Sequence, residues 1–257
     1  MTRDFYCDQI FTKMTDILYG KHPVLDALAA GTAIDKVLLE EGTRGELEVS
    51  LRHACKKAGV QMQYIPRERF GKYTKQNHQG VIALLSAIPN YYSITDLLPA
   101  IFERGEVPLL ILLDNVTDVR NFGAIARTAE GAGAHAIIVA QKGVAHINAE
   151  AMKASAGALA TLPVCRETSL SVVLDLLGQS GVQVVASDLK GTLPLKSVDF
   201  TEPTAILIGS EGEGVSRHLL KRADMCFTIP MNGTTDSYNV SVAAGMMLYE
   251  ALRQRGV

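Results

Sequence analysis

Residues 205–216, AILIGSEGEGVS, decide the fold class of this 257-residue chain. An apolar run there leads straight into a glycine-rich turn, and a helix is predicted to follow. Unbroken aliphatic runs are typical of strands covered on both faces, and hence of a mostly parallel sheet. Ligands of such sheets bind beyond the carboxyl ends of the strands, where glycines let the backbone approach them closely. The acids Glu211 and Glu213 repel a phosphate, so the turn favours a cationic or hydroxyl-bearing ligand.

Strands and helices alternate along the rest of the chain. In the second half, strands are expected at 109–113, 136–140, 182–186, 205–208 and 225–229, and helices at 121–132, 148–158, 169–179, 215–222 and 239–254. A smaller α/β unit precedes them, with strands at 36–39, 60–65 and 80–85 and a helix at 46–58. A proline and an asparagine interrupt the pattern near 88–95, so we expect two α/β domains, residues 1–90 and 95–257.

Composition excludes several classes of protein. Hydrophobic residues make up 47% of the chain, which is enough for a sizeable core, yet no apolar run reaches the ~18–20 residues that span a bilayer. The N-terminus has no signal-peptide pattern. The four cysteines and six histidines show no ligand spacing, so neither a metal site nor a disulfide framework is expected. We therefore expect a cytoplasmic protein with no membrane association.

Positive charge is concentrated in the first half. The net charge of −2 counts mildly against a nucleic-acid binder, but residues 44–75 carry a net +5 with three aromatic residues interleaved. This stretch is either a solvated helix face with a lysine-rich loop or a surface that contacts phosphates and unpaired bases. The candidate RNA-binding residues are Arg52, Lys56, Arg67, Arg69, Lys72, Lys75 and His78.

Two further strand-to-helix junctions carry candidate site residues. In the segment 114–130, DNVTDVRNFGAIARTAE, Asn121 is expected to cap the helix, and Arg127 stands among small residues. A buried arginine needs a partner, so Arg127 should meet an anion or a carboxylate unless it lies on the solvent face. The segment 228–242, TIPMNGTTDSYNVSV, holds more cap-forming residues than one helix needs. It is either a polar loop or a site for a polar ligand.

Together these junctions resemble the motifs of the SpoU (TrmH/RlmB-type) family of RNA ribose 2′-O-methyltransferases, within the SPOUT superfamily. The matching motifs are NFGAIARTA at 121–129, IGSEGEGV at 208–215 and IPMNGTTDSYNVSVAAG at 229–245. The resemblance covers about 109–254 in the same order and spacing. In addition, YGKHPV at 19–24 and HQGV at 78–81 look like the family's small L30e-like RNA substrate-binding domain.

The resemblance implies a fold, a cofactor and an assembly. The second domain would be an α/β sheet whose C-terminal segment is threaded as a deep trefoil knot, and the enzyme would be a homodimer. S-adenosylmethionine, with no metal, would bind in the knot. The implied cofactor-binding residues are Gly209, Ile229, Tyr238, Ser187 and Met231. Tyr238 departs from the family pattern, in which leucine is usual at that position.

The resemblance also implies the catalytic residues Arg127, Asn121, Glu211, Ser237 and Asn239. Arg127 would grip an RNA phosphate and stabilise the developing alkoxide, because a guanidinium keeps its protons in proteins. Glu211 would orient Arg127 through a charge-assisted pair. The two asparagines would position the ribose or Arg127, and Ser237 would bond within the same group.

The expected reaction is methyl transfer to the ribose 2′-OH of structured RNA, with a guanosine of large-subunit rRNA as the target. The same chemistry on tRNA and a non-catalytic RNA-binding module are the alternatives. A nicotinamide-dependent oxidoreductase is disfavoured. Residues 131–136, GAGAHA, fit the dinucleotide fingerprint but follow a predicted helix and precede a strand, which reverses the required order.

Overall fold

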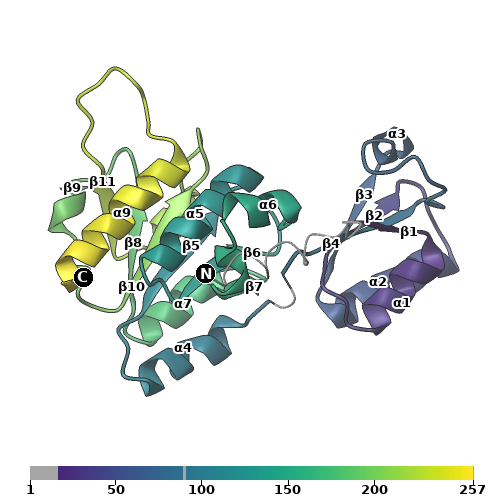
Figure 1. Ribbon diagram of the computed structural model, residues 1–257, viewed down its shortest axis with the longest axis horizontal. Helices are drawn as coiled ribbons and strands as arrows, with labels where there is room; N and C mark the ends of the chain where they lie inside the picture. The colour runs from purple at the N-terminus through teal and green to yellow at the C-terminus, as the bar shows by residue number, and fades with distance from the viewer. Residues whose placement is uncertain (1–16, 89–90, 257) are drawn as a thin grey trace, which may run out of the picture. The chain divides into compact units, whose positions relative to one another are not determined.

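A four-stranded sheet and a seven-stranded sheet, each with its own helices, form the two units into which the chain divides between Pro89 and Asn90 (Figure 1). The computed structural model describes residues 17–88 and 91–256. The first unit comprises β1 (Ile17–Tyr19), α1 (Lys21–Ala29), β2 (Ile34–Glu40), α2 (Glu46–Ala58), β3 (Gln61–Ile65), α3 (Arg67–Phe70) and β4 (Val81–Leu85).

The small sheet has a separate apolar core on each face. Its strand order is β1-β4-β2-β3, with β2 and β3 parallel and the other pairs antiparallel. Helices α1 and α2 pack on one face, where Val24, Leu51 and Cys55 meet residues of β2 and β4. On the other face, Phe70 of α3 closes a smaller group that includes Leu38 and Ile82. Consecutive elements α2, β3 and α3 thus cross from one face to the other.

The second unit is built on a parallel sheet. Its strands are β5 (Leu109–Asp114), β6 (Ala136–Ala140), β7 (Val164–Glu167), β8 (Gln183–Ser187), β9 (Leu193–Pro194), β10 (Thr204–Gly209) and β11 (Met225–Thr228). Its helices are α4 (Ile94–Glu103), α5 (Val119–Gly131), α6 (Ala149–Ala154), α7 (Leu170–Gln179), α8 (Arg217–Leu220) and α9 (Val240–Arg255), with single 3-10 turns at Ala158–Ala160 and Leu195–Ser197.

Helices cover both faces of this sheet, whose order is β7-β6-β5-β10-β8-β11-β9. Every residue of β5 and β10, the neighbours near its centre, is buried, as expected for strands covered on both sides. Helices α4, α7 and α8 share one core with the strands. Helices α5 and α9 contact each other and lie together over the sheet (Figure 1). The α/β fold class is confirmed, and the deep trefoil knot stays a prediction.

The sequence patterns locate most long elements and miss several short ones. The expected helix at 148–158 is in fact two pieces, because Ala156 and Gly157 adopt left-handed conformations (φ 49° and 90°) that end α6. Helix α4 is not predicted because Pro99 lies in its middle, where a proline usually ends or kinks a helix. Strand β7, VCRE, is short and half polar, so its alternation is too brief to detect.

Candidate functional site

The carboxyl ends of three neighbouring strands define the candidate site. Strands β10, β8 and β11 are adjacent and parallel, and they end at Gly209, Ser187 and Thr228. Ile229 follows β11 directly. Three of the predicted cofactor-binding residues therefore lie at one edge of the sheet, which is where open α/β sheets bind ligands.

The glycine-rich turn after β10 is folded back on itself. A Cβ atom on Gly209 would lie 1.9 Å from the carbonyl carbon of Gly214, so only glycine fits. The Gly214 N–H donates to the Ser210 carbonyl at 3.0 Å, and Gly212 and Gly214 both have positive φ (91° and 68°). The turn therefore has a defined shape and carries Glu211 at its exposed tip.

A buried carboxylate anchors the far end of this turn. Asp114, the last residue of β5, is 6% exposed and accepts hydrogen bonds from the Ser216 N–H at 2.7 Å and from the Asn115 side chain at 2.9 Å. Asp114 also pairs in register with Gly209. Asp114 is not among the residues predicted from the motifs, although an acid at the end of an apolar strand is a usable signal.

Three polar side chains from distant parts of the chain meet above the strand ends. The Asn121 amide donates to Glu211 Oε1 at 3.1 Å, and the Asn239 amide donates to Asn121 Oδ1 at 3.1 Å and to Glu211 Oε1. The Val240 N–H also lies 3.3 Å from Glu211 Oε1. We call Asn121, Glu211 and Asn239 the polar triangle. It joins the three sequence motifs through side-chain contacts.

Helix caps hold two corners of the polar triangle. Asn239 Oδ1 accepts from the N–H groups of Ser241 at 3.0 Å and Val242 at 3.4 Å, which makes Asn239 the N-cap of α9. The expectation that Asn121 caps α5 is wrong. The cap is Asp118, whose carboxylate accepts from the N–H groups of Arg120 and Asn121 at 2.9 and 2.8 Å. Asn121 lies within the first turn, and its side chain can therefore face Glu211.

Arg127 stands apart from the polar triangle. It lies six residues after Asn121 on α5, which turns its side chain about 240° around the helix axis from Asn121. The expected Arg127–Glu211 pair is not formed, since Glu211 Oε1 accepts from the two asparagine amides instead. Arg127 and Ser237 are both exposed, and among the described residues neither has an assigned hydrogen bond or ion pair. Both are thus accessible to a ligand.

Backbone lines the edge where the cofactor is predicted to bind. A Cβ atom on Gly191, in the loop after β8, would lie 2.4 Å from the Phe227 carbonyl carbon. The Tyr238 hydroxyl donates to the Pro230 carbonyl at 3.2 Å, so the loop after β11 folds back on itself. The half-buried ring of Tyr238 therefore lies beside the Ile229–Met231 segment. Backbone groups and one flat ring suit an adenosine moiety, so the residues present fit S-adenosylmethionine.

The predicted RNA-binding residues do not form one surface. Arg52 and Lys56 lie on α2, which covers one face of the small sheet, and Arg52 is bonded to Glu48 and Tyr64. The others lie on α3 and the segment after it, over the opposite face. They are Arg67, Arg69, Lys72, Lys75 and His78. The chain crosses the sheet between α2 and α3, so these basic residues are divided between its two faces, and their binding of RNA stays a prediction.

Within the described residues, 17–88 and 91–256, no helix is long and apolar enough to cross a bilayer, and no group of three or more potential metal ligands is present.

Comparison with known proteins identifies the class. Residues 108–249 match the model of the SpoU rRNA methylase family, and residues 17–91 match the model described as RNA 2′-O ribose methyltransferase substrate binding. The chain therefore belongs to the SpoU rRNA methylase family.

Relatives and solved structures extend this likeness over more than nine-tenths of the chain. A Bacillus subtilis protein named as a TrmH family tRNA/rRNA methyltransferase, YacO, is 34% identical over 93% of this chain and 96% of its own. An uncharacterized tRNA/rRNA methyltransferase from Synechocystis is 37% identical over 94% of this chain and 63% of its own. The structure of AviRb, a SpoU methyltransferase from Streptomyces viridochromogenes in complex with AdoMet, covers 93% of this chain and 90% of its own, with 26% identity and a TM-score of 0.59. An AdoMet-bound rRNA methyltransferase from Sinorhizobium meliloti covers 92% and 86%, with 27% identity and a TM-score of 0.57.

Proposed function

We propose that the chain transfers a methyl group to the ribose 2′-OH of a nucleotide in structured RNA, with a guanosine of large-subunit rRNA as the target. The observation that carries this proposal is the polar triangle, which unites the three motif segments at the carboxyl edge of the sheet. Relatives named as tRNA/rRNA methyltransferases and a family model named for RNA 2′-O ribose methyltransferases support it.

S-adenosylmethionine supplies the methyl group, which it carries on a cationic sulfonium. Gly209, Ile229 and Met231 would hold it through their backbone at the strand ends, and Tyr238 would cover the adenine. Ser187, at the end of β8, would be the fifth residue to contact the cofactor. Gly209 would contact the cofactor through its backbone, because a Cβ atom at this position would collide with Gly214.

Arg127 would bind the RNA. Its exposed guanidinium donates hydrogen bonds in a planar fork that matches a phosphate and can stabilise negative charge on the 2′-oxygen as its proton passes to solvent water. Ser237 is exposed on the loop before α9 and would bond to the same ribose. Because guanidinium groups retain their protons in proteins, Arg127 acts here as a donor rather than a base.

The polar triangle would position the reacting groups. Glu211 Oε1 already accepts two amide hydrogen bonds and lies near a backbone N–H, so its role is to fix Asn121 and Asn239 rather than to remove a proton. Both asparagines then present fixed polar atoms toward the ribose. Holding an attacking oxygen in line with a methyl group is where orientation contributes most to the rate.

We also propose that the enzyme is a homodimer that associates through α9. Val242 and Tyr249 are 49% and 67% exposed and stand seven residues apart, on the same side of this helix. Light scattering after size-exclusion chromatography tests this. A mass of twice 27.7 kDa supports the dimer, and a monomer at micromolar concentration contradicts it.

The reaction is tested with isotope-labelled S-adenosylmethionine and separated RNA fractions from cells that lack this protein. Large-subunit rRNA should accept the label, and tRNA and small-subunit rRNA should not. Label in tRNA alone would move the target and leave the chemistry intact. Absence of label from every fraction and from ribosomal particles, with cofactor binding intact, would contradict the proposal and favour a non-catalytic RNA-binding module.

A further inference from the structure

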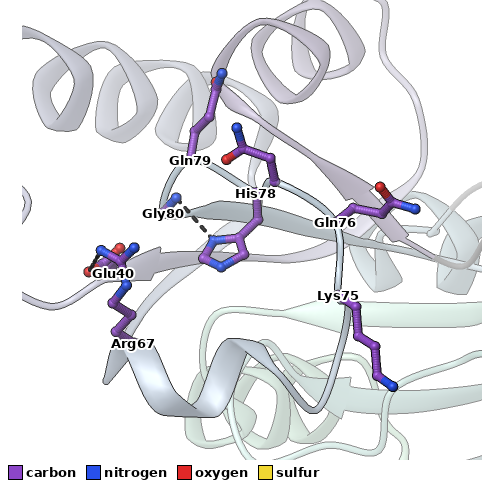
Figure 2. Close-up of a pocket in the computed structure, with 8 residues that line it drawn as sticks. Glu40, Arg67, Lys75, Gln76, His78, Gln79 and Gly80 are labelled. Atoms are coloured by element: carbon purple, nitrogen blue, oxygen red, sulfur yellow. Dashed lines mark hydrogen bonds and ion pairs between the residues drawn. The ribbon is translucent and has the colours of Figure 1, made fainter.

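The small unit contains a polar pocket whose lining includes none of the residues proposed above for methyl transfer. It has a volume of about 540 Å³ and is lined by Glu40, Arg67 and the segment Lys75–Gly80 (Figure 2). This volume is within the range of pockets that bind small molecules or single nucleotides. All of its lining residues belong to the first unit of the chain, so the pocket is complete without the large sheet.

His78 is held in a fixed orientation in this pocket. Its ring stacks on Phe70 with centroids 4.4 Å apart and an angle of 12° between the planes. Its Nδ1 atom accepts a hydrogen bond from the Gly80 N–H at 3.1 Å (Figure 2). Because Nδ1 is the acceptor, the proton of the neutral ring is on Nε2, which is therefore available as a donor.

The segment that lines the pocket is hydrogen-bonded to the other sequence motif of the small domain. The Gly20 N–H donates to the Val81 carbonyl at 3.0 Å, and the Lys21 N–H lies 3.4 Å from Gln79 Oε1. These contacts join YGKHPV at 19–24 to HQGV at 78–81. Gln79 has a φ of 49°, which is uncommon for a residue with a side chain. Such conformations persist where the surrounding structure fixes them and are frequent at ligand sites.

The charged groups of the pocket are arranged as neighbours of opposite sign. Glu40, at the end of β2, has Oε1 3.3 Å from an Arg67 terminal nitrogen (Figure 2). Gly80 packs against this glutamate, since a Cβ atom there would lie 3.0 Å from Oε2. Lys75 is exposed at the other end of the lining segment. The pocket therefore offers a carboxylate acceptor beside guanidinium and imidazole donors, with an ammonium group nearby.

This set of groups matches one nucleobase better than the others. The Watson–Crick edge of guanine has two adjacent N–H donors, N1 and N2, beside the O6 acceptor. One carboxylate can accept both N–H groups, while a neighbouring guanidinium or imidazole donates to O6. Adenine, cytosine and uracil lack two adjacent N–H donors on that edge. Unpaired bases of RNA are read in this way on their exposed edges.

We propose that this pocket binds one unpaired guanosine of the RNA, with the base edge against Glu40 and Arg67 and the backbone phosphate near Lys75. The inference rests on RNA being the substrate and adds a sequence preference to it. The small domain would then select RNA by one exposed guanosine, through residues that take no part in the proposed methyl transfer.

Fluorescence anisotropy with the full chain tests the base preference. The probes are four labelled hairpin RNAs that differ only in one unpaired loop nucleotide, G, A, C or U. The wild type should bind the G hairpin about tenfold more tightly than the others, which corresponds to one good base-edge contact. Glu40→Gln should remove this preference, because an amide can accept only one of the two N–H groups and also presents a donor. Equal binding of the four hairpins by the wild type, or an unchanged preference in Glu40→Gln, would overturn the proposal.

Two lysine variants distinguish RNA binding at the pocket from general electrostatic attraction of RNA to the domain. Lys75→Ala should weaken binding of all four hairpins and reduce the salt dependence by about one phosphate contact. Lys57→Ala removes the same charge from α2, on the opposite face of the sheet, and should leave affinity unchanged. Equal effects of the two lysine variants would contradict a localised site. Both positions are exposed, so neither change should affect folding.

The pocket and the proposed reaction fail separately. If the wild type transfers methyl groups to RNA but shows no base preference, only the pocket proposal is wrong. If it prefers the G hairpin and binds S-adenosylmethionine but methylates no RNA, the proposed reaction is wrong and the pocket remains.

Discussion

Replacing Asn239 by aspartate separates the two tasks of this side chain. Its Oδ1 atom caps α9, and its amide donates to Asn121 and Glu211. Aspartate is as good an N-cap as asparagine, and its charge suits a helix N-terminus, so Asn239→Asp keeps the cap. The same change removes the donor and places a second carboxylate beside Glu211.

The magnitude of this repulsion follows from the geometry. Two carboxylates about 4 Å apart repel by about 1 kcal/mol at the dielectric constant of water and by about 4 kcal/mol at an effective value near 20. Both side chains are exposed, so the lower figure applies, and Glu211 can relieve the repulsion by turning into solvent without loss of stability of the fold. Even this is enough to displace Glu211 from Asn121. A displacement of about 1 Å in a positioning group can reduce the rate about 100-fold.

Three measurements on Asn239→Asp are decisive together. We expect single-turnover methyl transfer to fall about 100-fold, while S-adenosylmethionine affinity by calorimetry changes little and the melting temperature stays near that of the wild type. Asn239→Ala should lose the same activity and also the cap, which costs about 1 kcal/mol or about 2–4 °C.

Asn148→Ala is the matched control, because Asn148 caps α6 by accepting from the Ala151 N–H at 3.0 Å. It should show the same loss of stability with full activity. Wild-type activity in Asn239→Asp, or equal loss of activity in the two alanine variants, would refute the positioning role.

Other predictions follow from backbone packing, titration and thiol burial. Gly209→Ala should abolish cofactor binding and destabilise the fold by about 1–3 kcal/mol, because the new methyl group overpacks against Gly214. Gly178→Ala, on the open side of α7, should instead stabilise the fold by about 0.5–1 kcal/mol. Equal free energies of unfolding for the two variants in denaturant would contradict this. Hydrogen bonds from Arg253 and Gln254 lower the pKa of Glu250 from 4.5 to about 2, so the carboxylate stabilises the fold above pH 4.5 and this contribution is lost as the pH falls toward 2. Urea unfolding of Glu250→Gln should lack that part of the pH dependence, and a slope equal to that of the wild type would exclude the effect. The thiol prediction uses a Cys7→Ser variant, since Cys7 lies outside the described residues. In the native protein, iodoacetamide should label the partly exposed Cys226 first. Burial raises the pKa of the Cys55 thiol to about 11 and that of the Cys165 thiol to about 12, which makes both less reactive. Peptide mass spectrometry measures the labelling rate of each thiol. Faster labelling of either buried thiol would show that the cores open more readily than the packing implies.

Local patterns in the sequence are enough to predict the long central strands of the large sheet. The apolar runs of β5 and β10 indicate strands buried on both faces, and both are fully buried. Helix α2 spans Glu46–Ala58, as its apolar spacing and Gly59 predict. These features depend on neighbouring residues alone, which is why the sequence is sufficient for them.

The contacts within the site depend on distant parts of the chain and could not be predicted in the same way. The partners of Glu211 lie 90 and 28 residues away, and they meet only because β10 lies next to β5 and α9 returns beside α5. Arg127 stands six residues after Asn121, about 240° around α5, and the residue types along this helix do not show which of the two side chains faces Glu211.

The same limit applies to the small domain. Net charge in residues 44–75 indicated a basic surface, but charge counted along the chain does not show which face of a sheet each residue occupies. The reversal between α2 and α3 divides the charge between two faces. The pocket at Lys75–Gly80 arises from contacts among β2, α3 and the loop before β4.

Alkaline hydrolysis of RNA methylated in vitro tests the proposed chemistry most directly. A 2′-O-methyl group blocks the attack of the ribose hydroxyl on the neighbouring phosphate, so it leaves an alkali-resistant dinucleotide. The wild type should place all transferred label in such dinucleotides, and Arg127→Ala should place none while still binding S-adenosylmethionine. Label recovered in mononucleotides would mean that a base is methylated and would contradict ribose methylation by this site.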